Sequence, residues 1–291
     1  MPDVLCLLAH PDDEIFCADL LARLTDEGHS LHLACWTRGE GGRHYGDPPR
    51  ATADTLGAVR EQEMRASAEV LGADSLEFLN YVDPPSTDGH RAPEHDPAQL
   101  TEDIRALIEK RAPDLVLTHG SSGEYGHPAH RLVHESTNEA VGTGGAPKPA
   151  LYSFNAYHST LPELNILNRW DWGDLKVDSA PSAEAKALVL GCHVTQWTAF
   201  VGKRETVTEY KQGIIDHVTS LPAETCCCHR TGRANVSPSI LSTWAEGLEP
   251  IRQHPRDVLR DQMRKYRHKA RIAVGEGLLA LRQRLRNGSA L

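Results

Sequence analysis

One histidine and three carboxylates follow directly on an apolar run near the start of the sequence. The run Val4–Ala9 reads VLCLLA, and the segment His10–Glu14, which reads HPDDE, comes immediately after it. Neighbouring carboxylates repel one another unless a positive charge lies between them, and a divalent metal ion held by histidine and carboxylate supplies that charge. The alternative is a helix start whose acids are solvated near the positive end of the helix dipole. The histidine in front and the apolar run behind favour a metal site.

A second group of the same kind lies further along the chain. The segment Gly123–His130 reads GEYGHPAH. Pro128 is favoured at the first position of a helix, which places His127 near the helix start and His130 one turn into it. Residues three apart share a helix face, so one of these histidines can reach a metal held by the first group while the other faces what the metal binds. Two histidines and one carboxylate leave coordination positions open, as in catalytic sites.

The other histidines near these groups give weaker signals. His130 and His134 are four residues apart, as in the zinc-binding HExxH motif, but Arg131 stands where that motif needs its glutamate. A site of that type is therefore rejected. Four histidines are interpreted as structural, with the last of them the strongest exception: His119, His134, His158 and His193.

Strand-like and helix-like patterns alternate through the first 142 residues. Strands are expected over Val4–Ala9, Ser30–Trp36, Ser75–Leu79 and Asp114–His119, and helices over Ile15–Glu27, Gly57–Leu71, Ala98–Lys110 and from Pro128 to about Val141. This order predicts an α/β fold in three layers, with a mostly parallel sheet between helices. Because the long polar loops follow strands, they are expected to lie together at the carboxyl-terminal edge of the sheet, where such folds build their sites.

The second half of the sequence gives fewer signals. A strand is expected over Leu151–Phe154, a helix over Ser182–Leu190 and a long charged helix over Pro255–Arg286. We interpret residues 1–291 as a single domain, with a core half over 1–142, a completing or lid region over 150–250 and a basic helical extension over 251–291.

Composition places the chain among ordinary globular proteins, with 40% hydrophobic and 24% charged residues among 291. No run of 18 apolar residues and no basic leader is present, so neither a membrane span nor a secretory signal is expected. Cys6, Cys17 and Cys35 are expected to be small core residues in a reducing compartment, which indicates a cytoplasmic protein. The Cys226–Cys228 run has no ligand pair near it in the sequence and does not favour a second metal site.

Charge is unevenly distributed along the chain. The net charge is −9, yet the stretch from Arg252 to the end holds eleven basic and three acidic residues. A basic tail can bind nucleic acid, but it can also lie against the acidic body or against a neighbouring subunit. Because no nucleic-acid motif accompanies it, we favour the second interpretation, with a homo-oligomer as one form of it and no nucleic-acid partner.

Four motifs in order carry a family resemblance. AHPDDE, TRGEGG, REQE (Arg60–Glu63) and YGHPAH resemble the PIG-L/LmbE-like family of metal-dependent N-acetylglucosaminyl de-N-acetylases over about the first 140 residues. A weaker similarity follows at Lys186 and at His193–Gln196, which is similar to a segment that borders the family's site. The resemblance implies a Rossmann-like fold and a divalent metal, usually zinc, with iron or another divalent metal as alternatives. It implies these site residues: His10, Asp13 and His130 as metal ligands, Asp12 as general base, and His127 with Tyr125 facing the oxyanion.

One position departs from the family pattern. The family commonly has His-Pro-Asp-His where this sequence has Ala129 in third place. If that aspartate holds the first histidine, then either Glu40 or Glu124 replaces it here, or His127 works in its neutral form. Arg60 and Glu63 are expected to pair with each other at the sheet edge.

These residues predict hydrolysis of an amide. A metal ion polarises the carbonyl and acidifies water, Asp12 moves the proton, and His127 and Tyr125 stabilise the oxyanion.

The leading hypothesis is removal of an N-acyl group, most simply N-acetyl, from a small-molecule amino sugar or glycoside. The loops over residues 37–56 and 80–97 would shape the pocket, with Arg38, Arg43 and Arg50 available to the substrate. The alternatives are an amidase or deformylase of another specialised metabolite and a non-catalytic sugar-binding protein; a dinucleotide binder is excluded because no GxGxxG follows the first strand.

Overall fold

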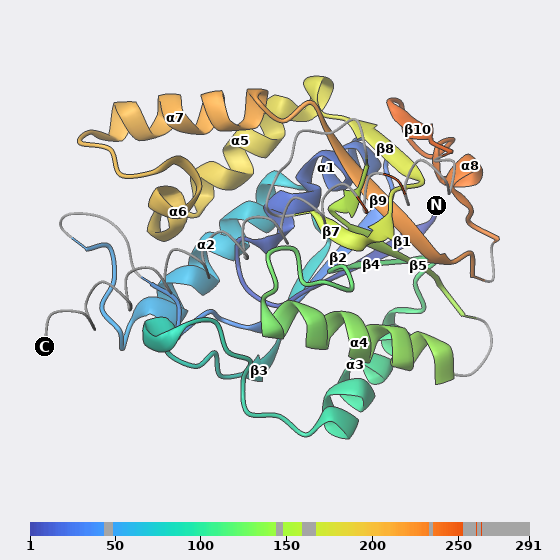
Figure 1. Ribbon diagram of the computed structural model, residues 1–291, viewed down its shortest axis with the longest axis horizontal. Coiled ribbons are helices and arrows are strands. Elements are labelled where there is room, and N and C mark those ends of the chain that lie inside the picture. Colours follow the sequence, from blue (N-terminus) through green and yellow to red (C-terminus); the bar gives the residue numbers. More distant parts are fainter. Residues whose placement is uncertain are drawn as a thin grey trace, which may run out of the picture. The chain divides into compact units, whose positions relative to one another are not determined.

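Figure 1 shows the computed structural model, which describes residues 1–43, 49–143, 148–158, 167–232 and 235–252, together with Arg260 and Met263. The backbone contacts divide the chain into two units, Met1–Ile251 and Arg252–Leu291. All elements named below belong to the first unit. The basic extension and the helix expected over Pro255–Arg286 lie outside the described residues, apart from the few just named.

An eight-stranded sheet forms the centre of the first unit, in the order β10-β8-β9-β5-β4-β1-β2-β3. Five strands run parallel: β1 (Asp3–Leu8), β2 (Ser30–Thr37), β3 (Ser75–Tyr81), β4 (Leu115–Thr118) and β5 (Ala150–Phe154). Three more continue the sheet in antiparallel pairing: β8 (Leu175–Asp178), β9 (Ala223–Arg230) and β10 (Leu248–Pro250). Two short strands form a separate pair, β6 (Ala156–Tyr157) and β7 (Asn168–Trp172). The predicted α/β fold with a mostly parallel sheet is confirmed.

The chain changes direction across the sheet at β1. It runs outward through β2 and β3 and then returns to place β4 and β5 on the other side of β1. The turns that follow β1 and β4 therefore lie side by side at the carboxyl edge, where open α/β sheets form their ligand crevice. This topology brings the His10–Glu14 segment next to the loop over residues 119–127.

Each face of the sheet packs against its own helices. Along β1 the side chains of Val4, Cys6 and Leu8 enter one core, and those of Leu5 and Leu7 enter the other, as the two-residue period of a strand requires. The first core is closed by α1 (Ala18–Asp26), α2 (Leu56–Val70) and α5 (Ala183–Cys192), and the second by α3 (Pro97–Arg111) and α4 (Pro128–Thr143). Figure 1 shows these two sets of helices on opposite sides of the sheet.

Local sequence signals explain where the predicted helices begin. Asp96 caps α3, because its side chain accepts a hydrogen bond from Ala98 N at 2.9 Å while Pro97 occupies the first helical position. The helix expected over Ile15–Glu27 differs from the prediction: Asp13–Cys17 forms a 3-10 turn, and α1 starts only after it. The acids of the first motif thus lie on a tight turn rather than on a regular helix.

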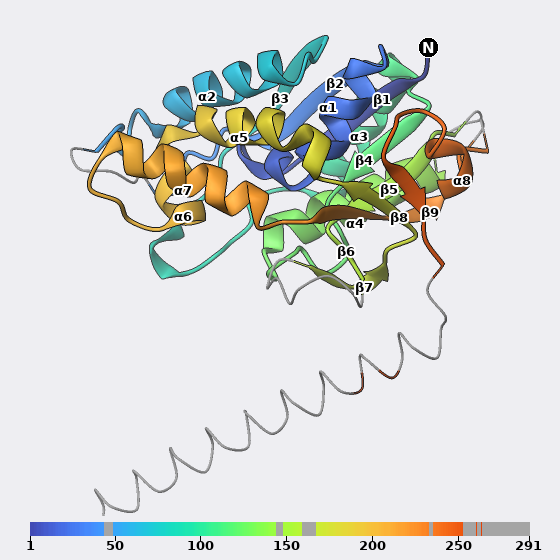
Figure 2. The ribbon, with the colours of Figure 1, turned by 90° about the horizontal axis from the view of Figure 1, so that it is seen from above.

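Extra strands and helices were expected in the second half, but the sequence did not give the bounds of several of them. Besides β8, β9 and β10, these are α6 (Trp197–Val201), α7 (Val207–Thr219) and α8 (Pro238–Leu241). In Figure 2, α6 and α7 lie beside α5. The Cys226–Cys228 run lies on β9, whose pairing with β5 and β8 comes from residues far away in sequence.

Two further sequence-based expectations bear on the core and on membranes. Cys6, Cys17 and Cys35 are buried in the first core, as expected for small apolar residues. Among the described residues, no helix combines the length and the apolar character that a bilayer crossing requires.

Candidate active site

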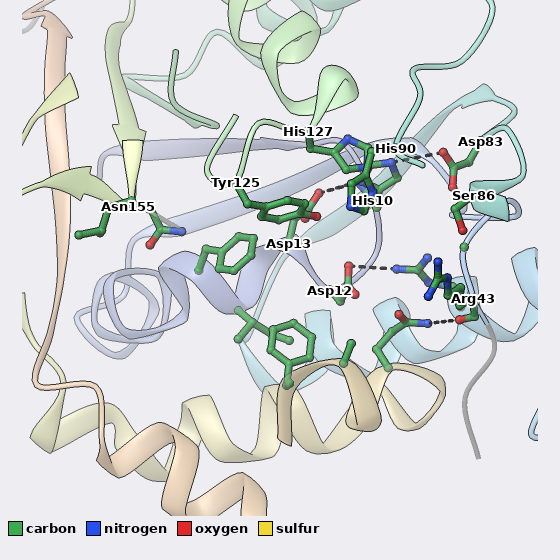
Figure 3. A pocket seen from close by; sticks show the side chains of 18 of the residues that line it. His10, Asp12, Asp13, Arg43, Asp83, Ser86, His90, Tyr125, His127 and Asn155 are labelled. Carbon is green, nitrogen blue, oxygen red and sulfur yellow. Dashed lines mark hydrogen bonds and ion pairs between the residues drawn. The ribbon is translucent and has the colours of Figure 1, made fainter. Parts of the chain in front are cut away.

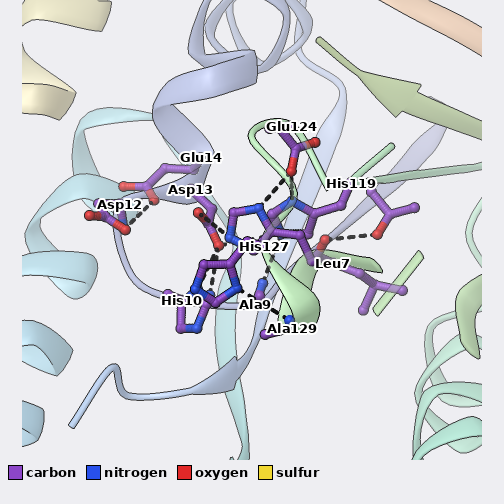
Figure 4. Close-up of polar contacts among 12 residues, drawn as sticks. Leu7, Ala9, His10, Asp12, Asp13, Glu14, His119, Glu124, His127 and Ala129 are labelled. Atoms are coloured by element: carbon purple, nitrogen blue, oxygen red, sulfur yellow. Dashed lines mark hydrogen bonds and ion pairs between the residues drawn. The ribbon is translucent and has the colours of Figure 1, made fainter. Parts of the chain in front are cut away.

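The turn after β1 is buried and is held by its own acids (Figure 4). His10 N donates a hydrogen bond to Asp13 Oδ2 at 2.8 Å, and Asp12 N donates to Glu14 Oε2 at 3.0 Å. Asp12 has a φ of 97°, a left-handed conformation that costs a residue with a side chain about 1–3 kcal/mol. The surrounding bonds therefore impose on Asp12 a backbone shape that it would not adopt by itself.

Asp13 lies among three imidazoles. Its carboxylate oxygens are 3.4 Å from His10 Nδ1, 3.3 Å from His130 Nε2 and 3.3 Å from His119 Nε2, and the residue is only 3% exposed. Two sets of three ligand-type atoms lie within 4.8 Å of one another: His10, His127 and His130, and Asp13, His119 and His130. The predicted ligands His10 and His130 thus both lie beside the buried carboxylate of the third predicted ligand, Asp13.

His130 presents an unpartnered nitrogen to that carboxylate. Its Nδ1 lies 2.6 Å from Glu124 Oε2 and donates a hydrogen bond to it, whereas its buried Nε2 has no hydrogen-bond partner. In the neutral imidazole, the lone pair of His130 Nε2 faces Asp13 Oδ1 across 3.3 Å, and a cation between them would stabilise this arrangement. Against the effect of burial, the charge of Asp13 raises the pKa of His130, so a proton and a metal ion compete for this position. A carboxylate behind a ligating histidine is also the usual outer support of a metal ligand. The residues present therefore fit a divalent metal ion.

His119 is placed behind the cluster rather than as a free ligand. Ala9 N donates to its Nε2 at 3.0 Å, and its Nδ1 lies 3.1 Å from Glu124 Oε2. Both ring nitrogens are engaged in a residue that is completely buried. This geometry agrees with a structural role, in which His119 and Glu124 together fix the position of His130.

Asp12 faces the same cavity but is paired with an arginine (Figure 3). Arg60 Nη2 lies 3.0 Å from Asp12 Oδ1, and the guanidinium also donates to the carbonyls of Pro11 and Gly39. Burial raises the pKa of Asp12 to about 6, against the opposing effect of Arg60. A carboxylate whose pKa lies near the working pH is suited to proton transfer.

The pair expected between Arg60 and Glu63 is replaced by other contacts. Arg60 turns to Asp12, while Glu63 accepts hydrogen bonds from Thr195 N at 2.8 Å and from Thr195 Oγ1 at 2.6 Å. Next to Thr195, His193 bonds to Glu14, which also accepts a bond from Ser67. The short His193–Gln196 segment therefore does border the site, and it locks the acidic turn from the side of α5.

His127 and Tyr125 complete the wall of the cavity opposite Asp12. The His127 ring lies 4.8 Å from the ring of His10 and 5.7 Å from that of Tyr125, measured between centroids. Ala129 N donates to His127 Nδ1 at 3.2 Å, which leaves the proton of a neutral imidazole on Nε2. Burial, together with His10 and His130, lowers the pKa of His127 to about 2.

Neither acid considered as a replacement for the aspartate missing at Ala129 contacts His127. Glu124 bonds to His119 and His130, and Glu40 accepts a bond from Asp83 N at 3.2 Å. Since the remaining alternative is a neutral histidine, the geometry favours His127 as a neutral donor through Nε2.

A cavity of about 550 Å³ opens over these side chains. Both predicted loops line it, the first through Gly42 and Arg43 and the second through residues such as Ser86 and Arg91. Of the three arginines proposed to meet the substrate, Arg43 lines the cavity, whereas Arg38 pairs with Glu61 and lies over the Phe78 ring.

The sequence did not identify three polar residues of the cavity. Asp83 Oδ1 lies 3.4 Å from His10 Nε2, and the His90 ring lies 4.6 Å from the ring of His127. Asn155 follows β5 with a φ of 51°, and its buried side-chain nitrogen lacks a hydrogen-bond partner. Figure 3 shows these side chains around the same cavity. No short motif marks them, because tertiary structure brings Asp83 and His90 from the loop after β3 and Asn155 from the end of β5.

Comparison with known proteins gives a family match in the first half of the chain. Residues 5–141 match the family described as PIG-L: GlcNAc-PI de-N-acetylase. A 1D-myo-inositol 2-acetamido-2-deoxy-alpha-D-glucopyranoside deacetylase of Corynebacterium kroppenstedtii is 34% identical over 174 residues, 54% of this chain and 42% of that protein. A probable N-acetyl-alpha-D-glucosaminyl L-malate deacetylase 2 of Bacillus anthracis is 29% identical over 224 residues, 76% of this chain and 92% of that protein. The chain thus spans less than half of the corynebacterial relative.

Solved structures share the fold at low sequence identity. The hydratase GalB of Pseudomonas putida superposes with a TM-score of 0.57 at 19% identity, over 79% of this chain and 96% of that one. The N,N'-diacetylchitobiose deacetylase of Pyrococcus horikoshii gives 0.56 at 18% identity, over 79% and 84%. Since these two proteins carry out different reactions, the shared architecture does not by itself specify the chemistry.

Proposed function

We propose that the protein, whose residues 5–141 match the PIG-L family, is a metal-dependent hydrolase that removes an N-acyl group, most simply N-acetyl, from a small-molecule amino sugar or glycoside. The relatives named as deacetylases of N-acetylglucosaminyl compounds support this substrate class. The buried cysteines of the core are consistent with action in the reducing cytoplasm.

The observation that carries the proposal is the arrangement around Asp13. Its carboxylate meets His10 and the unpartnered Nε2 of His130 in a buried site, and Asp12 stands beside this set on the same cavity. His10, Asp13 and His130 would hold the metal, zinc or another divalent ion that suits nitrogen and oxygen ligands. When bound, such a metal polarises an amide carbonyl and lowers the pKa of a water molecule.

Asp12 is the residue placed to move the proton. It accepts a proton from the water whose oxygen forms the new bond to the acyl carbon, and it returns that proton to the amine as the C–N bond breaks. The products are a carboxylate and a free amine. Arg60, 3.0 Å from Asp12 Oδ1, keeps the carboxylate oriented between these two transfers.

His127 and Tyr125 are placed to stabilise the negative charge on the carbonyl oxygen. With Nδ1 engaged by Ala129 N, His127 donates through Nε2, and this does not require a positive imidazolium. The Tyr125 hydroxyl is the second donor, from a side chain that is 45% exposed at the cavity mouth. A donor aimed at the oxyanion contributes about 2.7–4 kcal/mol to transition-state stabilisation in comparable enzymes.

Asn155 is the residue we expect to bind a substrate hydroxyl or carbonyl oxygen. Replacing Asn155 with glycine should raise KM about three- to tenfold with little change in kcat, because one hydrogen bond of about 0.5–1.5 kcal/mol is lost. Glycine keeps the φ of 51° without strain. Steady-state kinetics measures the effect.

Asn155→Ala provides the matched comparison. It removes the same amide but strains the backbone, so it should show the same KM and a lower thermal stability than Asn155→Gly. An unchanged KM in both variants would remove Asn155 from substrate binding.

Metal content and acetate release test the proposed function together. The full chain, purified without chelator, should carry metal and release acetate from N-acetylglucosaminyl glycosides, with inositol and malate glycosides as the first panel. Dialysis against a chelator should abolish the activity, and zinc or iron(II) should restore it. His130→Gln should lose the metal ion of this site together with the activity.

Two outcomes have different consequences. If the metal-loaded protein cleaves no N-acyl sugar, its substrate would have to be another amide, as for an amidase or deformylase. A chain that binds no metal at the His130 site even after zinc is added would overturn the proposal.

A further inference from the structure

A second cluster of ligand-type side chains lies outside the proposed active site. His134 on α4, Asp171 on β7 and His229 on β9 place their ligand atoms within 4.8 Å of one another. Together with Ser121 and Cys227 they line a surface cavity separate from the one over Asp13. Nothing in the proposed reaction uses these residues.

His134 is oriented as metal-ligating histidines usually are. Its Nδ1 donates to the backbone carbonyl of His119 at 2.8 Å, which fixes the tautomer and leaves the lone pair on Nε2. The Asn138 amide donates to this lone pair at 2.9 Å and is the contact that a cation would replace. The residue is buried, with the ring of His229 at 5.2 Å.

Asp171 is a preoriented carboxylate between these rings. Its Oδ2 accepts bonds from Ser121 N at 2.7 Å and from Ser153 Oγ at 3.1 Å, and its Oδ1 accepts from the Ser121 hydroxyl. Among the described residues no lysine or arginine forms an ion pair with it. The carboxylate is therefore buried and held by three hydrogen bonds, and its ion-pair partner among the described residues is the His229 imidazole, which favours a cation at this point.

His229 supplies the third ligand atom. Its Nε2 lies 2.9 Å from Ser153 Oγ and 3.9 Å from Asp171 Oδ2. Because the Ser153 hydroxyl donates to Asp171, Nε2 donates to Ser153 in this contact, and binding of a metal at Nε2 would require the tautomer protonated on Nδ1. The contact with Ser153 does not make a nucleophilic triad, because Ser153 is completely buried and donates its proton to Asp171.

Cys227 lies next to His229 in sequence and lines the same cavity as a half-buried thiol. The sequence alone offered no ligand pair near the Cys226–Cys228 run. The fold supplies that pair from α4 and β7, which makes the Cys227 sulfur a candidate for the fourth position.

We propose that His134, Asp171 and His229 form a second divalent-metal site, which takes zinc or a similar ion that prefers imidazole and carboxylate ligands. Three elements separated in sequence converge there, so the ion would fasten β7 and β9 to α4. The same helix carries His130 one turn before His134, and the site therefore supports the geometry of the first one without contacting the substrate.

Metal stoichiometry of zinc-saturated, dialysed full-length protein tests this site. Wild type should retain two ions per chain, His229→Gln one, His130→Gln one, and the double variant none. Asp171→Asn should also retain one ion, and this variant tests the second site if His229→Gln does not fold. The control His32→Gln removes a half-buried histidine that bonds only to Ser75 among the described contacts, and it should retain two ions.

Two further readouts separate this site from the proposed active site. In the His130→Gln background zinc should still raise the Tm, whereas in His130→Gln/His229→Gln it should not. Cobalt(II) bound to His130→Gln should show tetrahedral absorption bands, with a sulfur charge-transfer band that disappears in Cys227→Ser if the thiol is a ligand. A wild-type protein that binds one ion, lost in His130→Gln and unchanged in His229→Gln, would overturn the second site and leave the proposed function standing.

Discussion

Replacing Asp12 with asparagine should lower kcat about 10³-fold while the protein keeps its catalytic metal. The carboxylate is the group that we propose takes the proton from water, and asparagine has no basic oxygen to replace it. Among residues with a side chain, asparagine is one of those that best tolerate the left-handed φ of 97° at this position, so the turn should keep its shape. Single-turnover kinetics with metal analysis on the same sample measures both effects.

The control for Asp12→Asn is His130→Gln, which should lose the catalytic metal ion and the activity together. If Asp12→Asn lost metal to the same extent, Asp12 would be a ligand and the division between ligands and base would be wrong. If Asp12→Asn kept its kcat, the general base would have to be another residue of the cavity, and Asp83, whose Oδ1 lies 3.4 Å from His10 Nε2, would be the next carboxylate to test.

Replacing Lys186 with methionine should destabilise the protein by about 3–5 kcal/mol, the usual cost of removing one partner from a buried ion pair. Lys186 is 3% exposed, and its Nζ lies 2.9 Å from Asp19 Oδ2 and 2.6 Å from Glu224 Oε1. Without the ammonium group, two buried carboxylates would face each other. Urea unfolding, extrapolated to water, measures the change in the free energy of unfolding.

An exposed pair gives the matched control for Lys186. Lys110 lies 2.8 Å from Glu77 Oε2 with its side chain 59% exposed, and Lys110→Met should cost less than about 1 kcal/mol. The double variant Lys186→Met/Glu224→Gln should recover part of the loss, because it removes one of the two facing charges. Equal costs for Lys186→Met and Lys110→Met would show that the buried cluster does not depend on its lysine.

Lys186 also lines the cavity, so the KM of Lys186→Met shows whether this residue contacts the substrate as well as stabilising the fold. If the lysine only neutralises Asp19 and Glu224, Lys186→Met should leave KM unchanged at temperatures where the variant is folded. A selective rise in KM would instead indicate contact with the substrate.

The first half of the fold could be predicted because its signals are local. Val4–Ala9 and the helix patterns that follow have the periods of buried strands and amphipathic helices, and these periods survived in the structure as β1, α2, α3 and α4 with small shifts at their ends. In contrast, β9 reads AETCCCHR and β10 has three residues, so neither shows a period by itself. Their strand conformation is set by pairing with β8 and β5, which the sequence order does not reveal.

The features of the candidate site likewise fall into those that the sequence predicts and those that only the structure shows. His10, Asp12 and Asp13 are adjacent in sequence, and His127 and His130 share one helix start, so type and spacing were enough to place them together. Side-chain pairing was less predictable.

The pairings of Arg60 and Glu124 illustrate why. Arg60 pairs with Asp12 and not with Glu63, because its guanidinium extends across the edge of the sheet to the turn after β1 rather than along its own helix. Glu124 pairs with His119 and His130 and not with His127, because its carboxylate lies between the end of β4 and the first turn of α4. These choices depend on distances of a few ångströms that only the packed structure defines.

The position of β5 limits how the family-matched part of the chain can be separated from the rest. That part ends at residue 141, yet β4 is completely buried because β5 (Ala150–Phe154) pairs along its open side, and β9 covers β5 in turn. A fragment cut after residue 141 would end its sheet with the bare apolar edge of β4, the kind of edge that recruits other chains and aggregates. The smallest autonomous piece therefore extends at least to Arg230, so the sequence boundary of the family match is not a boundary of folding.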